Sequence, residues 1–283
     1  MSSPVLVYQA YGHADILHEA VLSVASALKL QSIEHDFIVV IYTDAPDYFK
    51  QFLPSSVQYI IVPPKKWEEW KGNQQFVHRA KIMMLLDAVE RFEGDFLYCD
   101  TDTYFLSSPS SLFYSIEKGD LVMHVDEGSL HNSKNKVFQK LEKFLIAHAR
   151  FAIPVDMHMW NAGVLGFKSS DSSLLREVLK LSDELYQAYP KHVMEQLAFS
   201  FHFGLRNRVA CGNQVFHYWD FKEYRSVLRS FFEKHKGESY EVWVRDVDRI
   251  LPMELIKKKQ AYFKRSYLLR KIDKLLGKQV SYL

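Results

Sequence analysis

The first hundred residues alternate continuous apolar runs with segments of helical period, and this alternation restricts the fold more than any other feature. Ala14–Leu30 and Phe76–Phe92 repeat apolar residues at the spacing of a helix face. Four runs are predicted to be strands: Val5–Gln9, Asp36–Tyr42, Val57–Val62 and Asp95–Cys99. Of these, Asp36–Tyr42 is a continuous apolar run, as a strand buried on both faces would show. Strands that alternate with helices in this way predict an α/β fold with a mostly parallel sheet flanked by helices.

The rest of the chain continues the pattern and then becomes helical. We treat residues 1–221 as one domain and residues 222–283 as a helical, basic C-terminal extension. Lys65–Asn73, which contains two tryptophans, is predicted to be a polar loop. Further strands are predicted at Asp120–Val125, Trp160–Phe167, Arg208–Ala210 and Gln214–His217, and further helices at Lys134–Ala149, Ser173–Tyr189 and His192–Phe203.

Charge is distributed unevenly along the chain. Residues 252–283 hold nine basic and two acidic residues, a net +7, whereas the remainder is −5 within a total of +2. As an amphipathic basic helix this tail suits an anionic membrane surface; as a terminal helix packed on the domain it would expose a solvated basic face. The acidic remainder argues against nucleic acid as a partner.

Other features bear on localisation. No run reaches the roughly 18 apolar residues of a membrane span, and the N-terminus lacks the basic and apolar regions of a signal peptide. Cys99 and Cys211 lie far apart in apolar surroundings and are expected to be reduced core thiols. We therefore expect a cytoplasmic protein, held peripherally at the inner face of the membrane if the tail binds lipid.

Two aspartates stand at the end of the fourth predicted strand. Residues i and i+2 of an extended segment share a face, so Asp100 and Asp102 can direct two carboxylates at one point. Open α/β sheets bind ligands at such carboxyl ends, and a hard divalent cation such as Mg²⁺ binds through carboxylates and substrate phosphates. The segment also fits the Asp-x-Asp-x-Thr motif of haloacid-dehalogenase-type phosphatases, in which the first aspartate is the nucleophile. A fold that binds a nucleotide sugar or a partner without turnover is a further, non-catalytic alternative, against which the complete acidic pair argues.

Four other segments hold candidate functional residues. Asn161 offers a donor and an acceptor beside small residues that let a ligand approach the backbone. Glu195 and Gln196 open an apolar helix, and His217 lies among aromatic residues after a strand, as a neutral metal ligand would. Each of these also has an ordinary structural explanation. Arg79 and Lys81 lie two residues apart and point to different faces of their helix.

Taken in order, these motifs resemble the GT-A glycosyltransferases, and most closely those of glycosyltransferase family 8. The resemblance rests on Arg79 before Leu97-Tyr98-Cys99-Asp100-Thr101-Asp102, on Asn161-Ala162-Gly163, on Glu195-Gln196 and on a late His217. This chain has Glu195 where that family has aspartate. It also lacks the Lys-Pro-Trp that follows the family's late histidine.

The resemblance implies a metal-dependent transfer of a sugar from a nucleoside diphosphate, with UDP the expected nucleotide, to an acceptor hydroxyl. The acceptor is expected to be a glycan, or a lipid-linked sugar if the basic tail lies on a membrane. Asp100, Asp102 and His217 would bind Mn²⁺ or Mg²⁺. Arg79 or Lys81 would approach the diphosphate or sugar. The nucleotide would be lined by Tyr8, Gln9, Ala10, Tyr11, Thr43, Asp44 and Thr101, and the donor sugar by Asn161, Glu195 and Gln196, with Trp160 and Trp219 as stacking faces.

The stereochemical outcome stays open at this level. A retaining enzyme needs no protein base, and the family resemblance favours retention, whereas an inverting enzyme needs a carboxylate near the acceptor hydroxyl. Glu195 and Asp156 are the candidates for that base. From composition we also expect Lys65–Asn73 to be a flexible lid and Glu127–Lys136 to be a second mobile segment.

Overall fold

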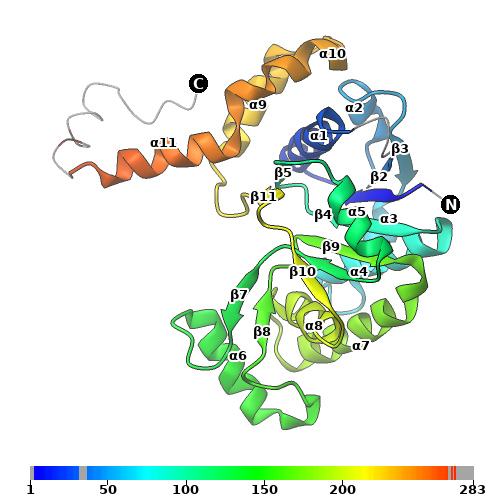
Figure 1. Cartoon of the computed structure of the whole chain (residues 1–283), viewed down its shortest axis with the longest axis vertical. Coiled ribbons are helices and arrows are strands. Elements are labelled where there is room, and N and C mark those ends of the chain that lie inside the picture. The colour runs from blue at the N-terminus through cyan, green and yellow to red at the C-terminus, as the bar shows by residue number, and fades with distance from the viewer. Residues whose placement is uncertain (1–2, 32–36, 267–268, 270, 272–283) are drawn as a thin grey trace.

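A seven-stranded sheet forms the centre of the molecule, with helices on both faces (Figure 1). The computed structural model describes residues 3–31, 37–266, 269 and 271. The strand order is β10-β6-β9-β4-β1-β2-β3, and only β9 runs antiparallel to its neighbours. These strands are β1 (Val5–Gln9), β2 (Ile38–Thr43), β3 (Gln58–Ile61), β4 (Asp95–Cys99), β6 (Leu121–Met123), β9 (Val164–Lys168) and β10 (Arg208–Ala210). The predicted α/β architecture is confirmed.

Both faces of the central strands β1, β2 and β4 are buried, which explains their continuous apolar runs, whereas Gln58 and Ile61 of the edge strand β3 are exposed. In β1, Leu6 and Tyr8 belong to the core shared with the C-terminal helices, and Val5 and Val7 belong to the core on the opposite face. Successive side chains of a strand point to opposite faces, so two cores require apolar residues at every position. The helices around the sheet are α1 (Ala14–Lys29), α2 (Pro46–Lys50), α3 (Pro64–Lys71), α4 (Val77–Arg91), α5 (Ser110–Glu117), α7 (Ser172–Ala188) and α8 (Met194–Phe203).

Two small antiparallel pairs lie beside the main sheet. β5 (Thr103–Phe105) pairs with β11 (Val215–His217), and β7 (Asp126–Ser129) pairs with β8 (His158–Trp160). The helix α6 (Lys136–Ala147) follows β7 in the chain. The segment Glu127–Lys136, which we expected to be mobile, therefore begins within a strand.

The prediction of a single strand over Trp160–Phe167 is wrong. β8 ends at Trp160 and pairs with β7, whereas β9 begins at Val164 and joins the main sheet. Between them Asn161 exchanges backbone hydrogen bonds with the segment around Val125, and the Gly163 carbonyl accepts one from Asp100 N–H at 2.7 Å. The chain changes partners at Ala162-Gly163, which an apolar sequence pattern cannot reveal.

The prediction of a loop over Lys65–Asn73 is also wrong, because most of this segment forms α3. Pro64 in the first turn has a backbone φ suited to a helix start. Trp67 and Trp70, three residues apart, share one helix face and are only 1% and 5% exposed. Trp67 stacks on Tyr11 with ring centroids 4.1 Å apart. The buried tryptophans anchor the helix, so the composition no longer supports a flexible lid here.

The C-terminal extension is helical where the structure describes it, as predicted. It contains α9 (Tyr224–Lys234), α10 (Tyr240–Trp243) and α11 (Pro252–Lys264). Trp243 Nε1 donates to the Phe52 carbonyl at 2.9 Å, and Arg225 pairs with Glu19 of α1. α11 projects away from the sheet (Figure 1). Short 3-10 segments lie at Ala149–Phe151, Ser169–Asp171 and Val244–Ile250.

The expectations for the basic tail and for membrane-spanning segments can be compared with the described residues only in part. Most of the basic tail after residue 266 lies outside the described residues. Among the helices that the structure describes, none combines the length and the apolarity that crossing a membrane requires.

Candidate active site

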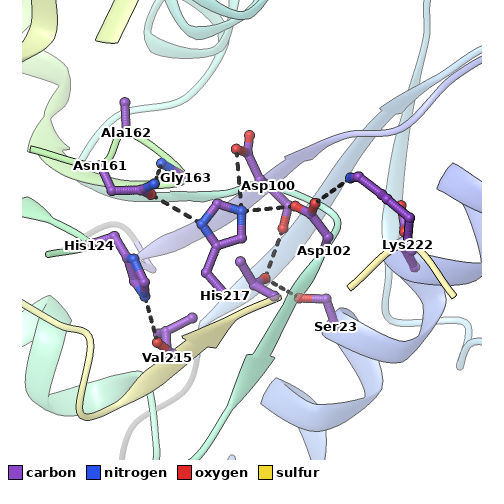
Figure 2. A network of polar contacts seen from close by, with 12 residues as sticks. Ser23, Asp100, Asp102, His124, Asn161, Ala162, Gly163, Val215, His217 and Lys222 are labelled. Carbon is purple, nitrogen blue, oxygen red and sulfur yellow. Dashed lines mark hydrogen bonds and ion pairs between the residues drawn. The ribbon is translucent and has the colours of Figure 1, made fainter. Parts of the chain in front are cut away.

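Pairing of strands brings the two aspartates and His217 together. β4 runs parallel to β1 with Cys99 opposite Tyr8, so Asp100 follows at the same edge of the sheet as Gln9. The β5–β11 pair places His217 directly opposite Thr103. As a result one ligand atom from each of Asp100, Asp102 and His217 lies within 4.8 Å of the others. Figure 2 shows the three side chains pointing toward one another.

The orientation of His217 is fixed by its neighbours. Its Nδ1 lies 3.1 Å from Asn161 Oδ1, and the same oxygen accepts the Gly163 backbone N–H at 2.9 Å. Because that oxygen accepts, Nδ1 of His217 is the protonated donor. Nε2 therefore faces the carboxylates, 3.0 Å from Asp102 Oδ1 and 4.0 Å from Asp100 Oδ2. Histidine ligands of metals are held in this way by a partner on the other ring nitrogen.

Electrostatics around this cluster favour an ionised Asp102 carboxylate. Burial would lower the pKa of His217, but the Asp102 contact outweighs burial and raises it. Burial would raise the pKa of Asp102, but the His217 hydrogen bond and nearby Lys222 lower it. Burial lowers the pKa of His124 to about 4, so this imidazole is neutral where it lies edge-on against His217, with centroids 5.3 Å apart.

Lys81 lies beneath the cluster as a buried cation. Its Nζ is 2.9 Å from Glu195 Oε1 and 3.5 Å from Asp100 Oδ1, and it donates to the Ala162 carbonyl at 3.1 Å. Burial would lower the pKa of Lys81, but the two carboxylates outweigh burial and raise it. Tyr98 OH also donates to Asp100 Oδ1, at 2.5 Å. Oδ1 of Asp100 is thus held by the phenol of Tyr98 and the ammonium group of Lys81.

Two adjoining hollows meet at the acidic turn. The larger, of about 810 Å³, contains most of the predicted sugar-side residues, and the smaller, of about 390 Å³, contains part of the predicted nucleotide side. The larger is lined, among others, by Lys81, Asp100, Asp102, Glu127, Asn161, Glu195, Gln196, His217, Trp219 and Lys222. The smaller is lined, among others, by Gln9, Tyr11, His78, Lys81, Asp100, Thr101 and Asp102.

Among the residues of the larger cavity that sequence reasoning missed, Glu127 and Lys222 contact predicted site residues directly. Glu127 accepts hydrogen bonds from Asn161 Nδ2 at 3.1 Å and Gln196 Nε2 at 2.8 Å. Lys222 Nζ lies 3.6 Å from Asp102 Oδ2. Glu127 lies on β7, which the sequence did not predict, and a lone lysine five residues after His217 is no motif. Only contacts in the fold single them out.

The structure corrects the predicted nucleotide pocket. Tyr8, Ala10 and Thr43 are 0% exposed, so their side chains do not line a ligand site. A strand buried on both faces shows no alternation that would separate core residues from pocket residues. Asp44 accepts the Gly12 N–H at 3.3 Å, at the rim of this region, and does not line either hollow.

Three further predicted residues lie away from both hollows. Arg79 binds Asp183 of α7 at 2.9 Å and the Trp70 carbonyl at 2.8 Å, so of the two basic residues only Lys81 faces the site. Trp160 packs under the guanidinium of Arg208, whose centre is 4.2 Å from its ring. Asp156 lies in an exposed turn before β8, where its carbonyl accepts from Ser129.

The fold and the site together define a GT-A type glycosyltransferase: a mostly parallel α/β sheet with an acidic, histidine-containing cluster at the carboxyl ends of its central strands. The chain belongs to the nucleotide-diphospho-sugar transferase family, whose model matches residues 51–249. This membership favours a glycosyltransferase over the phosphatase that the acidic pair also allowed. The predicted resemblance to GT-A enzymes is confirmed, while assignment to family 8 stays a prediction.

Solved structures with the same fold include other glycosyltransferases. The galactosyltransferase LgtC in complex with donor and acceptor sugar analogs is 13% identical, with 73% of each chain covered and a TM-score of 0.50. Mouse xyloside xylosyltransferase 1 is 12% identical over 74% of this chain and 86% of its own, with a TM-score of 0.50. An active-site mutant of LgtC is 14% identical over 73% of each chain, with a TM-score of 0.51. At identities this low, the structural similarity shows a shared fold alone. A comparison with curated protein sequences found no match.

Proposed function

We propose that this glycosyltransferase depends on a divalent metal and transfers a sugar from a nucleoside diphosphate, with UDP the expected nucleotide, to an acceptor hydroxyl. The observation that supports this most is the cluster of Asp100, Asp102 and His217 at the junction of the two hollows. Two carboxylates and one imidazole form a donor set that Mn²⁺ or Mg²⁺ accepts. The outward-facing Nε2 of His217, held by Asn161, fits the same role.

Different residues of the site would bind different parts of the substrates. Asp100, Asp102 and His217 would hold the metal, which when bound would neutralise the diphosphate leaving group. Lys222 adds an exposed ammonium group on the same side of Asp102. The remaining roles follow from position: Gln9, Tyr11 and Thr101 would bind the nucleoside, Asn161, Glu195 and Gln196 the donor sugar, and Trp219 the acceptor.

Retention of configuration is the outcome that the arrangement favours. An inverting enzyme needs a free carboxylate at the acceptor hydroxyl. Glu195 is engaged by Lys81 at 2.9 Å, and Asp156 lies outside the cavity. Both oxygens of Glu127 accept amide hydrogen bonds, from Asn161 and Gln196. None of these three carboxylates is placed as an unengaged base, so the leaving phosphate would accept the proton.

Thermal unfolding with UDP, GDP, ADP and CMP, each with and without Mn²⁺, tests the proposal. A ligand that binds only the folded state stabilises it by about 2.7 kcal/mol at a hundredfold excess over Kd. We expect a metal-dependent rise in Tm with UDP that Asp102→Asn abolishes and that Asp156→Asn, in an exposed turn, retains. Equal shifts with and without Mn²⁺ would contradict metal dependence, and a shift with another nucleotide would contradict UDP.

We also propose that the acceptor is a glycan or lipid-linked sugar, reached at a membrane through the basic tail. The support is the charge distribution, together with exposed Lys257, Lys258 and Lys264 on α11. Leu255 of the same helix is buried in the core, so its first turn is packed on the domain. This anchoring leaves the later, basic turns to face a surface.

Charge reversal at the lysines tests the membrane contact without removing Leu255. Replacing Lys257, Lys258 and Lys264 together by glutamate should abolish sedimentation with vesicles that contain phosphatidylserine. Vesicles of phosphatidylcholine alone should bind neither protein. The matched control replaces three exposed lysines of α6 by glutamate: Lys136, Lys140 and Lys143. Equal loss in both triple variants would show a general charge effect and contradict a role for the tail.

A further inference from the structure

A line of buried hydroxyl groups lies beneath the acidic turn and is not explained by substrate binding. Tyr8 on β1, Ser23 on α1 and Thr103 on β5 are each 0% exposed. Tyr8 OH is 3.0 Å from Ser23 Oγ, Ser23 Oγ is 2.7 Å from Thr103 Oγ1, and Thr103 Oγ1 is 2.8 Å from the Asp100 carbonyl. Figure 2 shows Ser23 joined to the turn through these contacts.

The direction of this chain follows from counting hydrogens. A carbonyl oxygen only accepts, so the single hydroxyl hydrogen of Thr103 must point to Asp100. Thr103 Oγ1 can then only accept from Ser23, and Ser23 Oγ can only accept from Tyr8. Three hydrogen bonds thus run one way, from the sheet core to the backbone of the first aspartate. Chains of this kind strengthen one another where water is excluded.

The position of Thr103 affects all three candidate metal ligands, Asp100, Asp102 and His217. Its side chain holds the Asp100 carbonyl, and its backbone lies opposite His217 in the β5–β11 pair. Directly after β11, Tyr218 N–H donates to the Asp102 carbonyl at 3.0 Å. A shift of Thr103 would therefore change the positions of both carboxylates relative to the imidazole.

We propose that Thr103 and Ser23 are positioning residues of the metal site, whose hydroxyl chain fixes the Asp100–Asp102 turn so that both carboxylates stay directed at His217. The inference rests on the proposed metal-dependent function. Neither hydroxyl reaches the cavity, so both act through the backbone of Asp100. Tyr8, which the sequence analysis placed in the nucleotide pocket, is instead the first donor in this series of hydrogen bonds.

The test compares Mn²⁺ binding by the full chain without any nucleotide, followed by calorimetry or by the spin-resonance signal of free Mn²⁺. Thr103→Val keeps the shape of the side chain and removes its hydroxyl. We expect its Kd for Mn²⁺ to rise about ten- to a hundredfold, the usual effect of losing a group that orients a metal ligand. Thr103→Ser restores the hydroxyl and should bind nearly as the parent does.

Tyr8→Phe is the matched control for a merely structural effect. It also removes one buried hydroxyl, but it leaves the Ser23–Thr103–Asp100 bonds intact. Tyr8→Phe removes one hydrogen bond and should lose about 1 kcal/mol of stability, and Thr103→Val removes two and should lose about 2 kcal/mol. Only Thr103→Val should lose Mn²⁺ affinity. If Tyr8→Phe weakens Mn²⁺ binding as strongly as Thr103→Val, the effect is one of stability and the inference is overturned.

The result also separates this inference from the proposed function. If the parent chain binds Mn²⁺, Asp102→Asn does not, and Thr103→Val binds within about twofold of the parent, then the metal site stands and only the positioning role is wrong. If the parent chain itself fails to bind Mn²⁺, both proposals are wrong. Should Thr103→Val not fold, Ser23→Ala replaces it, with a several-fold loss expected and an unchanged Kd overturning the inference.

Discussion

Gly163→Ala should damage the metal site without removing any candidate ligand. A Cβ atom at this position would lie 2.4 Å from His217 Cε1 and 2.6 Å from His217 Nδ1. Carbon atoms in contact are about 3.5–4.0 Å apart, so the ring must move by about 1 Å or more. The backbone of Gly163 does not have a positive φ, so alanine adds a steric effect and no backbone strain.

Movement of the ring has a direct consequence for metal binding. The imidazole is 5% exposed and held between Asn161 and Asp102, so leaving its place breaks the 3.1 Å contact with Asn161 and turns Nε2 away from the carboxylates. Loss of such support weakens metal binding about ten- to a hundredfold, which equals about 1.4–2.8 kcal/mol. Crowding of a packed site also costs about 1–3 kcal/mol of folding stability.

Gly166→Ala separates these two effects. Its Cβ would lie 2.6 Å from Val122 Cβ and 2.7 Å from Ile116 Cδ1, within the apolar core of the sheet. We expect both variants to lose stability in urea unfolding, but only Gly163→Ala to lose Mn²⁺ affinity in calorimetry. If Gly163→Ala is folded and binds Mn²⁺ within about twofold of the parent, the reasoning that places His217 in the metal site is wrong.

Three other outcomes follow from the contacts of single residues. Lys81→Met leaves the Glu195 carboxylate buried without its partner and should cost about 3–5 kcal/mol in urea unfolding; a cost below about 1 kcal/mol would refute the buried pair. Arg79→Gln breaks the contact with Asp183 outside the site, so calorimetry should show unchanged nucleotide affinity. Burial lowers the pKa of His18, so the folded state resists its protonation, and stability should fall as pH drops through about 6.5. Chemical unfolding of His18→Leu across this range should show less loss than the parent, and equal losses would exclude His18 as the cause.

The acidic pair and the strands that lead to it could be predicted from sequence. A strand buried on both faces is a continuous apolar run, and β1, β2 and β4 are such runs within a residue or two of their ends. Asp100 and Asp102 follow β4 directly, and the open end of a parallel strand is where ligands bind. These are local properties of the chain, so reading them required no knowledge of what packs against what.

The partners of the acidic pair were decided only by tertiary structure. A fully apolar strand does not show which face meets a cavity, so Tyr8 was assigned to a pocket although it lies in the core, while Gln9 beside it lines a hollow. Glu127 and Ser23 come from segments far from Asp100 in the chain. They reach the site because β7 and α1 pack there, and packing depends on every element at once. The sequence by itself determined the fold class and the acidic turn, and the folded chain decided what surrounds them.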